Sequence, residues 1–167
     1  MIKLTTIPID QLKDIIAYSF EGDNDLLNTY HISPGTLSHC VSHTFGFIEK
    51  NKDFYGSDWH CYRIDCIDCV EGDGAAIGYT VTITNAELPN ELYSFGIRKE
   101  FRKKEILQKW LAEVEKTIGI PYYLVVWTKN TRAVEFFIKN GFYQQDHNEL
   151  TKLTNGQMEA RTLFVKT

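Results

Sequence analysis

The 167-residue sequence has no apolar run long enough to cross a membrane as a helix. Such a helix needs roughly 18 or more apolar residues, and the longest conspicuous run, Tyr122–Trp127, is far shorter. The opening residues, MIKLTTIPID, also lack the basic, apolar and small-residue succession of a secretory signal. We therefore expect a cytoplasmic protein without a membrane partner.

The chain also lacks a basic excess, an internal repeat and a low-complexity segment. Its 18 Lys and Arg residues face 22 Asp and Glu residues, for a formal net charge of −4. Domains that neutralise many phosphates usually carry a strong basic excess, so the charge argues against a nucleic-acid partner. With 43% hydrophobic and 24% charged residues, the composition is that of a soluble globular protein. The length predicts one domain over residues 1–167.

Cysteine is scarce, with four residues at positions 40, 61, 66 and 69. Three of them lie close to His60, which raises the question of a metal site. In an extended strand successive side chains alternate between faces, so Cys66 points away from Cys61 and Cys69. We therefore expect no metal site, and free, partly buried thiols in a reducing compartment.

Hydrophobic periodicity predicts how strands and helices alternate along the chain. Period-two or continuous apolar patterns predict strands at MIKLTTI, 59–70, 75–84, 92–97 and 122–127, the last buried on both faces. Helical spacing predicts helices from about 10 to 20, with Asp10 as N-terminal cap, and from 33 to 48, opened by Ser33-Pro34.

Two more helices are predicted over 107–118 and 130–140, the second burying Ala133, Phe136 and Phe137. Residues 71–74 predict a turn, and Asn155-Gly156 predicts the turn of a closing hairpin. This order of elements favours an α/β sandwich with a mixed sheet.

One short segment is strongly basic although the protein as a whole is acidic. Five of the seven residues from 98 to 104 are basic, namely Arg98, Lys99, Arg102, Lys103 and Lys104. They stand between a predicted strand and the start of a predicted helix, where positive side chains oppose the helix dipole. A bound phosphate or pyrophosphate would explain this placement. The alternative is an ordinary solvated loop.

From this basic turn onward, the chain resembles the GNAT superfamily of N-acyltransferases, and the element order agrees over nearly the whole length. Members carry an acetyl-CoA pyrophosphate loop of the form Arg/Gln-x-x-Gly-x-Gly/Ala, and the matching residues here run from Arg102 to Leu107. Residues 130–142 resemble a second signature, with an Asn, an Ala three residues on, an aromatic pair and a terminal Gly-Phe. The resemblance implies a GNAT-like three-layer α/β fold with a mixed central sheet of about seven strands flanked by four helices.

The resemblance further implies acetyl transfer from acetyl-CoA, as co-substrate, to a primary amine of a small molecule or protein. The amine would attack the thioester directly in a ternary complex. Backbone groups of Phe95 and Ile97 would hold the pantetheine arm and polarise the carbonyl. The residues implied to bind the rest of the cofactor are Arg102, Lys103, Lys104, Glu105, Ile106 and Leu107 at the pyrophosphate, Asn130 at the exit side, and Phe137.

Two residues are candidates for the proton transfers. Glu91 lies six residues before Ile97, where several family members carry the general base for the amine; the alternative is a polar turn residue. Phe137 stands where a tyrosine often protonates the departing thiolate, and it has no proton to donate. Tyr143 is the candidate substitute.

The departures from the family pattern support an alternative function. Glu105 and Leu107 replace the loop glycines, and a Leu side chain there obstructs close approach of a phosphate. The alternative is a GNAT fold that has lost acyl transfer and serves as a binding or structural module, such as a phage-encoded one. Side chains such as Leu107 and Trp127 would then fill the gap between the fourth and fifth strands.

The acceptor side carries a further expectation. Acidic and aromatic residues near the first helix suit a cationic amine, and these are Tyr18, Phe20, Glu21, Asp23, Asp25 and Tyr30.

Overall fold

The fold is built on one seven-stranded mixed sheet. The structure is a computed structural model that describes residues 1–25, 36–52, 58–68, 75–152 and 158–167, and for residues 146–149 it describes the backbone alone. The strand order is β1-β2-β3-β4-β5-β7-β6, and every neighbouring pair is antiparallel except β4 and β5. The strands are β1 (Ile2–Thr6), β2 (Asp58–Cys66), β3 (Ala75–Thr84), β4 (Asn90–Ile97), β5 (Tyr122–Trp127), β6 (Tyr143–Lys152) and β7 (Met158–Lys166).

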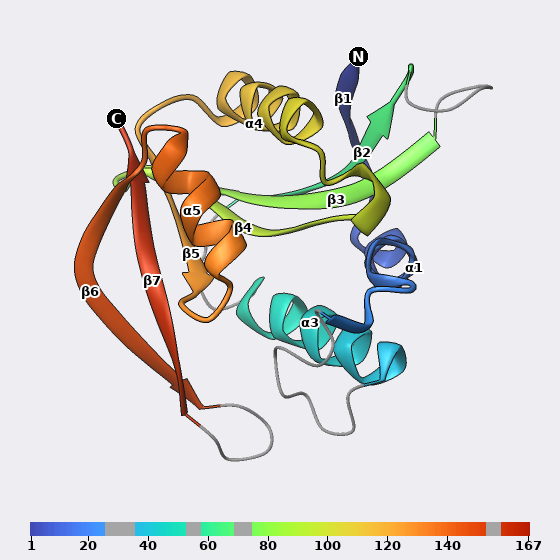
Figure 1. The fold of residues 1–167 in the computed structure, drawn as a ribbon, viewed down its shortest axis with the longest axis horizontal. Helices are drawn as coiled ribbons and strands as arrows, with labels where there is room; N and C mark the ends of the chain where they lie inside the picture. Colours follow the sequence, from blue (N-terminus) through green and yellow to red (C-terminus); the bar gives the residue numbers. More distant parts are fainter. Residues whose placement is uncertain (26–35, 53–57, 69–74, 153–157) are drawn as a thin grey trace.

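Four α-helices of the described residues cover the two faces of the sheet (Figure 1). Two pack below β3 and β4 in that view, α1 (Ile9–Phe20) and α3 (Leu37–Lys52). On the other face lie α4 (Lys104–Ile118) and α5 (Thr131–Lys139). A short 3-10 helix, η1 (Lys99–Phe101), joins β4 to α4. The predicted mixed sheet of about seven strands with four helices is confirmed.

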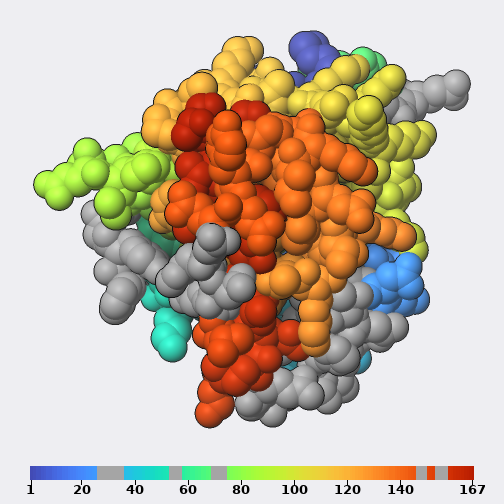
Figure 2. Space-filling view, turned by 60° about the vertical axis from the view of Figure 1, so that its left-hand side comes forward, coloured from blue at the N-terminus to red at the C-terminus, as the bar shows by residue number. Residues whose placement is uncertain are grey.

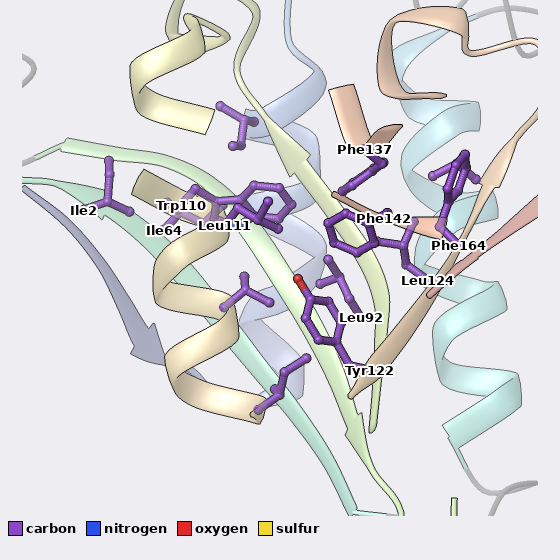
Figure 3. Close-up of a cluster of buried hydrophobic side chains, with 14 of the residues drawn as sticks. Ile2, Ile64, Leu92, Trp110, Leu111, Tyr122, Leu124, Phe137, Phe142 and Phe164 are labelled. Carbon is purple, nitrogen blue, oxygen red and sulfur yellow. The ribbon is translucent and has the colours of Figure 1, made fainter. Parts of the chain in front are cut away.

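The larger core lies between the sheet and the pair α4 and α5 (Figure 3). Trp110 of α4 is buried, and its indole Nε1 donates to the Thr80 hydroxyl at 3.0 Å, so α4 is fixed to the middle of β3. Phe137 of α5 is equally buried. Burial of such aromatic side chains is a large part of what stabilises the packing of helices on a sheet.

The second core holds α1 and α3 against the opposite face of the sheet. Leu12 and Ile16 of α1 are fully buried there, and Phe20 meets Tyr79 of β3 edge to face at 6.1 Å. The predicted helical face of the first helix therefore does pack inward, as its period of 3.6 residues requires. Asp10 is not its cap, however: the N-cap is Pro8, and Asp10 lies in the first helical turn.

Two glycines let β3, β4 and α1 approach one another closely. A Cβ on Gly78 would lie 2.1 Å from the Gly96 carbonyl oxygen of β4. A Cβ on Gly96 would lie 2.7 Å from the Tyr79 ring and 3.3 Å from the Phe20 ring at the end of α1. Glycine at both positions brings the end of α1 directly onto the last residues of β4.

Other expectations are corrected in detail. The strand expected over 59–70 ends at Cys66, since residues 67 and 68 form a bend. Strand β5 is not buried on both faces: Tyr122, Leu124 and Val126 are buried and the alternate residues are half-buried, because no helix of the described residues covers that second face as closely. In α5 only Phe137 is buried, while Ala133 and Phe136 are half-buried.

The cysteine expectation is correct for two positions and wrong for a third. Cys40 and Cys61 are free and buried, and burial raises the pKa of both thiols. Cys66 is disulfide-bonded rather than free. The predicted cap Ser33-Pro34, the turn at 71–74 and the hairpin turn at Asn155-Gly156 lie outside the described residues.

Candidate functional site

The sheet opens between β4 and β5. These two parallel strands pair only from Asn90 to Leu92 on one side and from Tyr122 to Leu124 on the other. Beyond these residues β4 continues to Ile97 and β5 to Trp127 in different directions (Figure 1). Among the described strands, the backbone of the second half of β4 therefore has a neighbour on its β3 side alone.

A β-bulge and the alternating direction of the backbone amides and carbonyls determine which backbone groups of β4 face this opening. Ser94 pairs with Val81 and Leu92 with Thr82, so Tyr93 is the extra residue of a bulge between them. At the end of the strand the Arg98 amide donates to the Ile77 carbonyl at 2.8 Å. Alternation of backbone groups then turns those of Ile97 and Phe95 away from β3, toward the opening.

Glu91 lies at the point where β4 and β5 begin to diverge. Its side chain is 8% exposed, and the Tyr123 hydroxyl of β5 donates to its Oε2 at 2.7 Å. Because the next residue, Leu92, belongs to the core under α4, Glu91 points to the face that carries α1 and α3. A buried carboxylate at this place can accept a proton from a group that enters the opening.

Aromatic side chains lie on the same face as Glu91. The Trp59 ring of β2 meets the Tyr93 ring edge to face at 4.6 Å, and Phe47 of α3 stacks on Tyr93 at 6.1 Å. Phe47 is 39% exposed, so these rings form a wall that reaches from the sheet to the surface. Such a wall suits an organic molecule whose polar end is directed to the carboxylate.

The start of α4 supplies a second set of polar groups. Its N-cap is Lys103, which makes no side-chain capping bond, and the first bond within the helix runs from the Leu107 amide to the Lys103 carbonyl at 3.0 Å. The amides from Lys104 to Ile106 precede that bond and have no intrahelical acceptor. Together with the helix dipole they can bind an anion.

Leu107 differs from its expected role in two ways. Its amide is already bonded within the helix, so it does not join the amides that could bind a phosphate. Its side chain does not cover the turn, because it is half-buried and packs against the core under α4. Trp127, the other residue expected to fill the gap, contacts Arg161 of β7, whose guanidinium lies 5.7 Å from the ring centroid.

Three of the five basic residues in the turn bind acidic groups of the protein itself. Arg98 donates to Glu21 at 3.2 Å and to Glu100 at 2.7 Å, and the Glu100 hydrogen bond raises the pKa of the guanidinium. The other two pairs are Lys99 with Asp25 and Arg102 with Asp23. Within the described residues, Lys103 and Lys104 form no ion pair, and both are exposed.

These pairs correct the expected acceptor site. Glu21, Asp23 and Asp25 were expected to suit a cationic amine, but each one already binds a basic residue of the turn between β4 and α4. Tyr18 lies beneath the Arg98 guanidinium, 4.3 Å from its ring centroid, and Phe20 packs in the core. Tyr30 lies outside the described residues.

The remaining predicted residues lie farther from the opening or within the core. Asn130 caps α5, its side chain accepting a hydrogen bond from the Ala133 amide at 3.3 Å. Phe137 is 1% exposed and lies behind Phe95, with the ring centroids 5.8 Å apart. Tyr143 is exposed at the start of β6, and the registers of β4, β5, β7 and β6 place it in the same row as Glu91. Three strand spacings of about 4.8 Å put it ~14 Å away.

Tyr123 is a partner of Glu91 that was not predicted from the sequence. The residue belongs to an apolar run, and only the parallel register that pairs Glu91 with Tyr123 brings the two side chains together. No local pattern reveals that register.

In the described residues no three or more His, Cys, Asp or Glu side chains are grouped closely enough to hold a metal ion. Nor do the described residues include a helix both long and apolar enough to span a membrane.

No family model matches the sequence, and no curated protein matches it. Solved structures do match. A GNAT-family protein of Chromobacterium violaceum superposes with a TM-score of 0.68 at 11% identity, over 99% of this chain and 82% of its own. The spermidine/spermine N-acetyltransferase SpeG of Vibrio cholerae, solved in mutant forms, gives 0.59 at 14% identity, over 99% and 94%. Arabidopsis thaliana NAA60 in complex with a bisubstrate analogue gives 0.52 at 19% identity, over 75% and 92%.

Proposed function

The chain has the GNAT fold, as its sequence led us to expect, and from this premise we propose that it transfers an acetyl group from acetyl-CoA to a primary amine. The observation that carries the proposal is the separation of β4 from β5 directly beside the uncapped N-terminus of α4. The likeness to SpeG and NAA60 supports acetyl transfer as the general reaction. The acceptor is the amine of a small molecule or of a protein.

The groups at the opening fit the two ends of acetyl-CoA. Outward-facing backbone groups of Phe95 and Ile97 suit the amides of the pantetheine arm. The amides from Lys104 to Ile106, with the exposed Lys103 and Lys104 side chains, suit the pyrophosphate. Glu105 brings a negative charge to the same turn, but its side chain is exposed and water screens it. Acetyl-CoA supplies the activated acyl carbon, and the residues of the chain orient it.

Glu91 is the proposed general base. The incoming amine loses a proton to the Glu91 carboxylate, directly or through a water molecule, as its nitrogen attacks the thioester carbonyl. Tyr123 keeps the carboxylate oriented by its hydrogen bond to Oε2. The Phe95 and Ile97 amides are available to polarise the carbonyl as negative charge develops on its oxygen.

Among the described residues, neither position considered for it protonates the departing CoA thiolate. Phe137 has no proton to give, and Tyr143 lies in a strand at the far edge of the sheet. We therefore assign protonation of the thiolate to water. Three substitutions, at positions 105, 107 and 137, motivated the alternative of a lapsed, structural module. Leu107 packs against the core, so its side chain is no longer a reason for that alternative, and the catalytic function is the one we propose.

Calorimetric titration of acetyl-CoA tests this proposal on the wild type and on a Lys103→Ala/Lys104→Ala variant. A matched control, Lys109→Ala/Lys116→Ala, removes the same charge from exposed positions farther along α4. We expect micromolar binding by the wild type and the control, and binding weaker by about tenfold or more in the first variant, since a hydrogen bond to a charged group contributes about 1.5–3 kcal/mol. No binding to the wild type at millimolar acetyl-CoA would contradict the proposal and favour the structural module.

A further inference from the structure

We propose that Arg102 is a positioning residue that works with buried Asp23, and that it is not a ligand of the cofactor phosphates. This inference rests on the proposed function and refines it. The motif resemblance assigned Arg102 to the pyrophosphate. The side chain instead points back to β4 and across to the end of α1.

Arg102 makes a hydrogen bond and an ion pair with two different parts of the chain. Its Nε donates to the Ile97 carbonyl at 2.6 Å, which closes the turn from β4 through η1 onto the last residue of the strand. Its terminal nitrogen binds the Asp23 carboxylate just after α1. A planar guanidinium can make both contacts at once, whereas an ammonium group has a single nitrogen.

The location of Asp23 makes this pair more than a surface contact. Its side chain is 2% exposed, and a carboxylate that is so buried needs a charged or hydrogen-bonding partner. The Asp23 amide also donates to the Phe20 carbonyl at 3.1 Å, so the residue is tied to the last turn of α1. Asp23 therefore holds the guanidinium in one place.

The end of α1 is itself held rigidly against β4. A side chain on Gly96 would meet the Phe20 ring, and Arg98 donates to the Tyr18 carbonyl at 3.0 Å. Figures 1 and 2 both show the end of α1 (blue) directly beside the turn that leads into α4 (yellow). The last turn of α1 is thus a fixed support for Arg102.

Arg102 consequently connects the two halves of the proposed acetyl-CoA site. The Ile97 carbonyl lies among the groups expected to hold the pantetheine arm, and the next residue after Arg102 caps the helix whose amides face the phosphates. A carbonyl oxygen has two lone pairs, so the bond from Arg102 leaves one for the arm and fixes its direction.

Two substitutions separate positioning from phosphate binding. Arg102→Lys keeps the positive charge, which a phosphate contact needs, but cannot reach Ile97 and Asp23 together. Arg102→Gln removes the charge. Each variant is assayed for kcat/KM with acetyl-CoA and with S-acetylpantetheine, a donor that lacks the pyrophosphate, at a saturating test amine.

For a positioning residue, Arg102→Lys and Arg102→Gln both lower kcat/KM about tenfold with either donor, because displacement of the donor by a fraction of an ångström has effects of this order. KM for the amine stays unchanged, and Asp23→Asn gives the same pattern. Asp25→Asn is the control: it breaks the exposed Lys99–Asp25 pair in the same segment, with side chains 51% and 78% exposed, and changes kcat/KM less than twofold.

Two results would overturn the inference. The first is a kcat/KM of Arg102→Lys close to that of the wild type. The second is a kcat/KM of Arg102→Gln that falls with acetyl-CoA but not with S-acetylpantetheine, which would make Arg102 a phosphate ligand. If the wild type uses neither donor, the proposed function fails and the positioning pair is tested on the ligand-free protein. Amide hydrogen exchange between residues 97 and 106 must then be about tenfold faster in Arg102→Lys than in the wild type or Asp25→Asn. Equal exchange contradicts the pair.

Discussion

Phe137→Tyr places a hydroxyl where the GNAT pattern that the sequence resembles often has a tyrosine, and the structure predicts that it destabilises the fold without aiding the reaction. Phe137 is 1% exposed. The rings of Phe95, Phe136, Phe142 and Phe164 surround it, with centroids 5.0 to 6.1 Å away. None of these side chains can accept a hydrogen bond from the new hydroxyl.

The expected magnitude follows from this environment. A hydroxyl buried without a hydrogen bond costs about 1–3 kcal/mol in proteins. For a chain of this length, 1 kcal/mol corresponds to roughly 2–4 °C in Tm, so a cost of about 2 kcal/mol lowers Tm by about 4–8 °C. Phe136→Tyr is the matched control: the residue precedes Phe137 on α5 but is half-buried, so its hydroxyl can reach water and the cost is below about 0.5 kcal/mol.

Calorimetric melting of the two variants and the wild type measures the difference, and the acetyl transfer rate is recorded on the same preparations. Equal Tm values for Phe137→Tyr and Phe136→Tyr, together with a severalfold increase in kcat for Phe137→Tyr, would contradict a core location of residue 137. The residue would then face the thiolate rather than the core.

Three further predictions concern other parts of the molecule. Gly78→Ala forces a Cβ to within 2.1 Å of the Gly96 carbonyl oxygen, and it lowers the free energy of unfolding by about 3 kcal/mol or more in urea denaturation. The control Gly46→Ala lies in open space on α3 and raises the free energy of unfolding by about 0.5–1 kcal/mol. Glu91→Gln lowers kcat by about 10²- to 10⁴-fold, and Tyr123→Phe lowers it by less. Neither variant changes the affinity for acetyl-CoA in titration. Equal rates for Glu91→Gln and the wild type would show that Glu91 is not the general base. The pKa of half-buried His43 is lowered, first by burial and then by His39, so the unfolded chain takes up this proton before the folded one. Stability is therefore lost as pH falls below about 6.5, and His43→Gln loses less between pH 7.5 and 5.5 in the same urea assay.

The fold was predictable because its elements carry local signals. The apolar run Tyr122–Trp127 and the segment Ala75–Thr84 are strands with the predicted bounds, since turn-forming residues flank both. The long helix before Gly119 is likewise where the spacing of Leu111, Val114 and Ile118 placed it. The prediction of Asp10 as the N-cap was wrong because the helix already starts at Ile9, with Pro8 as its N-cap.

The site was predictable only in part, because its defining contacts join residues far apart in the sequence. The basic turn was recognisable, but nothing local shows that Arg102 binds Asp23 while Lys103 remains exposed. Glu91 could be chosen by its distance along the sequence from the end of β4. That Tyr123 lies beside it follows only from the register of β4 and β5. A sequence pattern reports which residues are charged or apolar, and the tertiary fold decides which charges neutralise one another.

In the proposed complex acetyl-CoA binds where β4 leaves β5, with its phosphates at the start of α4. Amide hydrogen exchange with and without saturating acetyl-CoA detects binding at this place. The predicted result is slower exchange at residues 95–97 and 104–106 and no change in the β6–β7 pair, since ligand contacts protect the amides that they engage. Unchanged exchange at both segments, or protection confined to other elements, would contradict it.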